Sequence, residues 1–209
     1  MIPSSVPLYD DVFSILSPAD AVLDIGCGFG RTCSELSARG FRNLIGIDIN
    51  SSGIAHARSH VALAGLRFLV GDATALPFRD RAFSGAIMQA LLTAIPKYSD
   101  RQKVFGEAAR VLKPGGGLYI ACFAQSWHLQ KYRERYLSAL SEGYDEGTFP
   151  VFDSEGNLEY AAHHHSEKEL VFLIENSGLA IVSFRYERFI TRSGQAVNGM
   201  VVCARRDLG

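Results

Sequence analysis

The sequence of 209 residues predicts an α/β domain built on a doubly wound, mostly parallel sheet. Short apolar runs alternate with helical patterns in the first half of the chain, and a glycine-rich loop directly follows the first run. Such alternation is typical of βαβ units, whose right-handed crossovers place helices on both faces of a sheet. Ligands of such sheets bind at the carboxyl ends of the strands, and we therefore look for the site there.

Five apolar runs are expected to form buried parallel strands. They are Ala21–Ile25, Asn43–Ile47, Leu66–Val70, Ala82–Met88 and Leu118–Phe123. The helical patterns between them are Arg31–Arg39, Ser51–Ala64 and Asp100–Leu112. Gly40, Gly65 and the run Lys113–Gly116 follow these patterns directly, and such residues are typical helix stops.

The last third of the chain carries a different pattern. Gln125–Leu140 is aromatic-rich and looks helical, and Ser141–Asn157 is expected to be an ordered loop or lid. Ser166 and Glu169 form a capping box that opens a helix to about Asn176. Two alternating strands are expected to follow as an antiparallel hairpin at the sheet edge. These strands are Ala180–Arg188 and Ala196–Ala204, joined by the turn Thr191–Gln195.

Composition favours one soluble globular domain over residues 1–209. Hydrophobic residues make up 47% of the chain and charged residues 21%, and no apolar run has the roughly 20 residues of a membrane helix. The first residues lack a signal-peptide pattern, so a cytoplasmic protein is expected. A net charge of −1 with scattered basic residues disfavours nucleic acid as a partner. The four cysteines lack CxxC spacing and are expected to be buried free thiols.

A glycine-rich loop, Asp24–Arg31, connects the first strand to the first helix. Glycines at 26, 28 and 30 let the backbone turn sharply and approach a ligand, with the helix N-terminus facing an anionic group. A nucleotide-like ligand is the expected occupant, and a tight turn that binds nothing is the alternative. A dinucleotide fingerprint requires a third glycine where this chain has Arg31.

Acidic residues stand at the ends of the next two strands. Asp48 lies 20 residues after Gly28, at the position of an acid that accepts both hydroxyls of a ribose. Its alternative role is to cap the helix that starts at Ser51. Asp72 ends the third strand, where its carboxylate is placed to accept the amino group of adenine while the amide of Ala73 meets a ring nitrogen.

These segments together resemble the class I S-adenosylmethionine-dependent methyltransferases, specifically their type 11 or ubiquinone-biosynthesis-like group. The resemblance covers about Ala21–Phe123 and includes Arg110–Gly117 before the fifth strand. It implies a Rossmann-like three-layer sandwich with a seven-stranded sheet of order 3-2-1-4-5-7-6 and an antiparallel last strand. It also implies S-adenosylmethionine as methyl donor and S-adenosylhomocysteine as product.

The resemblance also implies roles for individual residues. The glycine loop would face the methionine part of the donor, Asp24 would assist its amino group, and the backbone of Gln89 would approach the sulfonium and that amine. The full expected donor site comprises Asp24, Gly26, Cys27, Gly28, Gly30, Asp48, Ile49, Asp72, Ala73 and Gln89.

The catalytic group stays unassigned. The fourth strand lacks the Asn/Asp-Pro-Pro-Tyr/Phe pattern of amide and adenine N-methyltransferases, and Leu91–Thr93 stands where family members often carry histidine. His128 and His164 are the candidates for a general base. The alternatives are that His128 packs on a lid helix and that His163–His165 is a solvated lead-in to the capping box. No metal site is expected, because neighbouring residues of a strand point to opposite faces.

The predicted acceptor is a small molecule, apolar or aromatic, under a lid formed by residues 124–165. Aromatic residues gather in and beside this segment, and Tyr9 is a further candidate for closing the site. The alternative is that these aromatics pack the insertion onto the domain. The methylated atom and the oligomeric state are not predicted. Two rival functions remain, a nicotinamide-dependent oxidoreductase and a non-catalytic binding or regulatory protein of the same fold.

Overall fold

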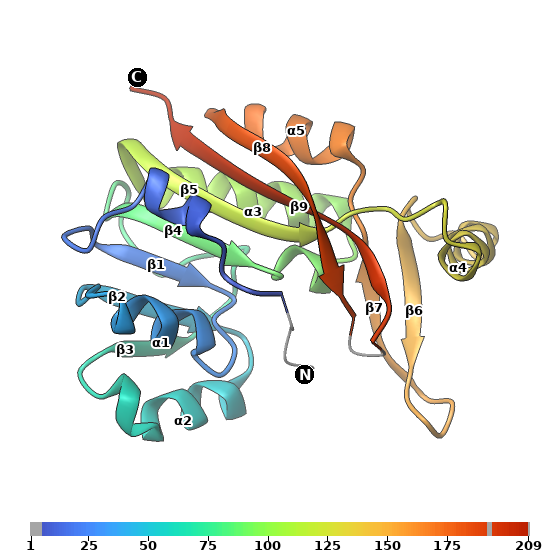
Figure 1. Ribbon diagram of the computed structural model, residues 1–209, viewed down its shortest axis with the longest axis horizontal. Coiled ribbons are helices and arrows are strands. Elements are labelled where there is room, and N and C mark those ends of the chain that lie inside the picture. Colours follow the sequence, from blue (N-terminus) through green and yellow to red (C-terminus); the bar gives the residue numbers. More distant parts are fainter. Residues whose placement is uncertain (1–5, 192–193, 209) are drawn as a thin grey trace.

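The computed structural model describes residues 6–191 and 194–208 as a seven-stranded sheet with helices on both faces (Figure 1). The strand order is β3-β2-β1-β4-β5-β9-β8, and a separate sheet pairs β6 with β7. The strands are β1 (Val22–Ile25), β2 (Leu44–Asp48), β3 (Arg67–Val70), β4 (Phe83–Gln89), β5 (Leu112–Phe123), β6 (Thr148–Phe152), β7 (Leu158–His163), β8 (Leu179–Ile190) and β9 (Ala196–Arg206).

Five α-helices and three short 3-10 helices connect the strands in the described part of the chain. The α-helices are α1 (Arg31–Ala38), α2 (Ser51–Ser59), α3 (Tyr98–Val111), α4 (Gln130–Ser141) and α5 (Glu167–Glu175). The 3-10 helices are η1 (Asp10–Ser14), η2 (Val61–Leu63) and η3 (Leu92–Ala94). None of the described helices combines the length and apolarity that crossing a bilayer requires.

The sheet confirms the predicted fold class and strand order. β1 to β5 pair in parallel, whereas β9 pairs antiparallel to both β5 and β8. β8 and β9 are the sixth and seventh strands of this sheet, so the observed order is the expected 3-2-1-4-5-7-6. The expected hairpin is present, although residues 192 and 193 of its turn lie outside the described residues.

Side chains of the central strands point alternately to the two faces of the sheet, so the hydrophobic core has two layers. Leu23 and Ile25 of β1 pack into the cluster that includes residues of α3 and α5, whereas Val22 packs with residues of η1 and α1. Figure 1 shows α3 and α5 behind the sheet and η1 in front of it. All four cysteines are buried and free, as predicted.

Three element boundaries differ from the sequence prediction by more than two residues. α2 ends at Ser59, because His60 adopts an extended backbone conformation with ψ 119°, and η2 follows as a separate turn. β5 begins at Leu112, since Leu112 already pairs with Phe83 of β4 before a register shift. α4 begins only at Gln130, because the backbone of Ala124 and Gln125 pairs with His165 instead.

The segment expected to be an irregular lid forms a small sheet instead. β6 pairs antiparallel with β7 through Thr148 and His163 at one end, while the intervening loop carries Gly156 with φ 87°. Pro150 obscured this strand in the sequence, but proline is tolerated on an edge strand, and both strands of a two-stranded sheet are edges. Figure 1 shows α4, β6 and β7 beyond the carboxyl ends of β4 and β5.

The helix predicted to start after Ser166 is present with half of its capping box, because the Glu169 carboxylate contacts Arg101 and His163 instead of the Ser166 amide. The Ser166 hydroxyl accepts the Glu169 amide at 3.1 Å, and Ser166 itself has the extended backbone typical of an N-cap. Replacing Ser166 with alanine leaves that amide unsatisfied, so we expect the free energy of unfolding to fall by about 1 kcal/mol in urea titrations. Ser138→Ala, in the exposed middle of α4, is the matched control and should change it by less than about 0.5 kcal/mol.

Candidate active site

The glycine loop after β1 adopts the backbone conformation that its sequence predicts. Gly26, Gly28 and Gly30 have φ values of 79°, 53° and 81°, a region that other residues rarely occupy. A Cβ atom at Gly26 would lie 2.6 Å from Leu91 Cδ1, and one at Gly30 would lie 2.7 Å from Leu63 Cδ1. Conformation and space therefore both require glycine at positions 26 and 30.

Asp48 fastens this loop to the end of β2. Its two carboxylate oxygens accept the amides of Gly28 and Asn50, each at 2.8 Å, and the residue is 8% exposed. Each oxygen retains lone-pair capacity for a further donor. Asp48 does not cap α2, which was its alternative role. Asn50 caps this helix, because its side chain accepts the amides of Ser52 and Gly53.

Asp24 is a buried carboxylic acid beneath the same loop. One oxygen lies 3.3 Å from the Cys33 thiol, which donates to it, and the other, Oδ1, has no partner among the described residues. Burial raises the pKa of Asp24 to about 7, and the nearby charge of Asp48 adds to the rise. A cationic ligand group that reached Oδ1 would stabilise the ionised form.

The expected donor-site residues near the ends of β2 and β3 are more exposed than Asp24 and Asp48. The exposed Asp72 accepts the amide of Thr74 at 2.8 Å and begins the turn that follows β3. Ile49, directly after Asp48, leaves 70% of its surface exposed, and Ala73 is half-buried. An exposed apolar side chain beside two carboxylates suits a flat ring with polar edges.

Gln89 ends β4, and its side chain has a role that the sequence did not predict. Its amide nitrogen donates to the carbonyls of Val6 at 3.0 Å and Pro7 at 2.8 Å, which holds the N-terminal segment over the end of β4. Its Oε1 is buried without a partner in the described chain. The next residue, Ala90, has φ 58°, a strained turn beside the glycine loop.

Comparison with known proteins identifies the family. A methyltransferase domain model matches residues 23–120. A crystal structure of an S-adenosylmethionine-dependent methyltransferase from Methanosarcina mazei is 40% identical, covers 98% of this chain and 100% of that one, and superposes with a TM-score of 0.90. The chain belongs to the S-adenosylmethionine-dependent methyltransferases. The donor of this family is S-adenosylmethionine, as the resemblance implied.

Curated relatives match about half of this chain. A 24-methylenesterol C-methyltransferase from Oryza sativa subsp. japonica is 37% identical over 108 residues, which is 50% of this chain and 29% of that protein. A fatty-acid O-methyltransferase from Mycolicibacterium smegmatis is 43% identical over 98 residues, which is 46% of this chain and 34% of that protein. The chain thus spans about a third of the length of these two relatives.

The aromatic insertion of this methyltransferase has a core of its own. Tyr132, Tyr136 and Phe149 are at most 4% exposed and surround the ring of His164. These residues support the alternative that the aromatics pack the insertion. Phe123 and Trp127, nearer the end of β5, remain only partly buried.

The two histidines considered as bases lie in different surroundings. His128 is exposed. His164 is buried, its Nδ1 lies 2.7 Å from the Tyr136 hydroxyl, and burial lowers its pKa to about 3, so its ring is neutral near pH 7. Neither histidine is in contact with the expected donor site in any observed interaction, and both stay predictions.

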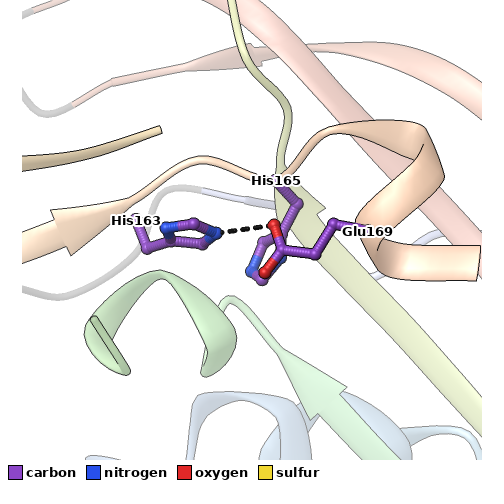
Figure 2. Close-up of side chains that lie close together, drawn as sticks. All are labelled: His163, His165 and Glu169. Carbon is purple, nitrogen blue, oxygen red and sulfur yellow. Dashed lines mark hydrogen bonds and ion pairs between the residues drawn. The ribbon is translucent and has the colours of Figure 1, made fainter. Parts of the chain in front are cut away.

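The other two histidines of the run form a buried cluster with Glu169 (Figure 2). His163 and His165 are 0% exposed, so a solvated lead-in is the wrong interpretation. They lie two residues apart and share a face, while His164 points into the aromatic core. The expectation of no metal site did not take into account that His163 and His165 share a face. It also did not take into account Glu169, which lies outside the histidine run.

A hollow of about 440 Å³ lies at the opposite edge of the sheet, near the start of β5. Ile15, Lys113 and Arg205 are among its lining residues. Because parallel α/β sheets bind their ligands at the carboxyl ends of the strands, this hollow is separate from the active site.

Proposed function

We propose that this protein transfers the methyl group of S-adenosylmethionine to a small, largely apolar acceptor. The observation that carries the proposal is the set of polar groups at the carboxyl ends of β1 to β4, in a chain that matches a family member along its whole length. The names of the curated relatives, which act on a sterol and on fatty acids, support the apolar acceptor.

The residues present fit the donor. Asp24 Oδ1 and Gln89 Oε1 are buried acceptors without partners in the described chain, and both suit the donor's ammonium group. Asp48 would accept the ribose hydroxyls while it keeps the Gly28 amide. Asp72 and Ala73 would bind the edge of adenine, and Ile49 would cover its face.

The donor supplies a methyl group that its positive charge has already activated. The protein therefore contributes mainly alignment of the acceptor and exclusion of water.

Gln89 holds residues 6 and 7 over the end of β4, and Tyr9 follows them with its ring stacked on Phe189 at 6.1 Å. Phe123 contacts the same Phe189 ring edge-on, and it ends β5 beside this N-terminal cover. The acceptor would lie between these partly buried aromatics and the donor.

A transfer assay with methyl-labelled donor tests the acceptor class. Long-chain fatty acids, sterols and simple phenols should accept label, whereas small polar amines should not. Phe123→Ala should raise the KM for the acceptor about ten-fold and leave donor affinity unchanged, because the Phe123 ring packs against Phe189 and His164, which are not among the expected donor residues. Phe172→Ala, which changes an exposed residue of α5, is the control. Transfer to polar amines only would contradict the proposal.

A further inference from the structure

We infer that His163, His165 and Glu169 form a binding site for one divalent transition-metal ion. The site lies where the end of β7 meets the start of α5, beyond the end of β5 (Figure 2). None of its three residues belongs to the expected donor site, and the inference does not depend on the proposed acceptor.

The spacing of the ligand atoms suits a single ion. His163 Nε2 lies 2.9 Å from Glu169 Oε2, and His165 Nδ1 lies 3.6 Å from the same oxygen. One ligand atom from each residue can be chosen so that all three lie within 4.8 Å of one another. Ligands at about 2.1 Å from one ion are separated by roughly 3 to 3.5 Å in tetrahedral or octahedral geometry. Small side-chain rotations therefore allow one ion to contact all three groups.

His165 is the observation that requires a ligand. Its side chain is 0% exposed, and neither ring nitrogen has a hydrogen-bond partner among the described residues. Burying an imidazole in this way is unfavourable unless its polar atoms are satisfied. A metal ion bound to one of these ring nitrogens would supply the missing partner.

Two neighbours hold the other ligands in place. Thr148 Oγ1 lies 2.7 Å from His163 Nδ1, so the hydroxyl oxygen can accept a hydrogen bond from Nδ1–H while Nε2 keeps its lone pair for the ion. Arg101 donates to Glu169 Oε1 at 2.9 Å, which leaves Oε2 to face the histidines. The positive charge of Arg101 is partly offset by Asp145 at 3.6 Å. Such outer contacts are typical of metal sites that keep their ligands oriented.

The donor set selects the class of ion. Two imidazoles and one carboxylate suit zinc, iron, cobalt or nickel, whereas magnesium and calcium prefer oxygen ligands alone. The Glu169 side chain is 15% exposed, so it offers a path from solvent to the cluster. A bound ion would join the β6–β7 sheet to α5, and so fix the insertion on the main domain.

Metal titration of the whole, chelator-treated protein tests the site. Zinc should bind with one-to-one stoichiometry in calorimetry, and cobalt should give a visible ligand-field spectrum, while magnesium gives neither. His165→Ala and His165→Gln should each weaken zinc binding more than about 100-fold, and Thr148→Val about ten-fold. Neither His165 variant removes an existing hydrogen bond, so both are expected to fold, and near-UV circular dichroism will check this.

The exposed pair His56 of α2 and His60, which directly follows that helix, is the matched control. Their rings are 6.1 Å apart, so they are the alternative place for an adventitious ion. His60→Ala should leave zinc affinity unchanged. The inference is overturned if wild type binds no zinc, if the His165 variants bind it equally well, or if His60→Ala abolishes binding. X-ray absorption of zinc-loaded wild type should show nitrogen and oxygen ligands, and sulfur ligation would also overturn it.

Discussion

Replacing Asp48 with alanine is expected to weaken the binding of S-adenosylmethionine and S-adenosylhomocysteine at least about 100-fold. The carboxylate accepts the amides of Gly28 and Asn50 at 2.8 Å, so it sets the shape of the glycine loop as well as offering oxygens to a ribose. The substitution removes both effects and leaves two amides without their acceptor. Calorimetric titration with each ligand measures the loss.

Two further variants make this measurement specific. Asp48→Asn keeps one carbonyl oxygen for a backbone amide but loses the charge, so its affinity should lie between those of wild type and Asp48→Ala. Asp207→Ala removes an exposed carboxylate near the C-terminus and should leave affinity unchanged. Unchanged affinity in a folded Asp48→Ala protein would remove Asp48 from the donor site.

The donor half of the fold could be predicted because its signals are local. A parallel strand buried on both faces is a continuous apolar run, and the glycine and aspartate that end it lie at the edge where ligands bind. Gly26, Asp48 and Asp72 therefore mark both the fold and the expected site. The side-chain role of Gln89 was missed because its partners, Val6 and Pro7, are more than 80 residues away in the sequence.

The insertion could not be predicted because its contacts are not local. Pro150 obscures β6, which forms only because β7 supplies an edge to pair with. Three consecutive histidines look solvated in the sequence, yet each is buried by partners from another element. Tyr136 of α4 contacts His164, and Glu169 of α5 contacts His163. No periodic pattern in the sequence carries this information.

Asp24 is expected to contribute to the stability of the folded protein, and this contribution should be lost as pH rises from about 4 to about 7; it is measured as the difference between wild type and Asp24→Asn. Burial raises the pKa of Asp24 in the folded state from its ordinary 3.8 to about 7. Between these values Asp24 is protonated in the folded state and ionised in the unfolded state, so its contribution to the free energy of unfolding decreases with pH. A shift of roughly three units corresponds to on the order of 4 kcal/mol, lost in full above about pH 7.

The variant Asp24→Asn should remove this dependence and separate stability from donor binding. Relative to wild type it should gain stability as pH rises, since no ionised carboxylate is left in the core, and urea unfolding at about pH 5 and about pH 8 measures the difference. Its affinity for the donor should nevertheless be lower above pH 7, because the ammonium group loses an ionised partner.

Donor binding by the wild type should change with pH in the opposite direction to the contribution of Asp24 to stability. Only the ionised Asp24 attracts the ammonium group, so affinity should increase as pH rises towards 7, by up to about ten-fold per unit, and then level off. Ionisation of the buried Asp24 thus destabilises the ligand-free protein, and the ammonium group of the bound donor offsets this effect. Unfolding curves for wild type and Asp24→Asn that stay parallel across this pH range would show instead that Asp24 is ionised throughout.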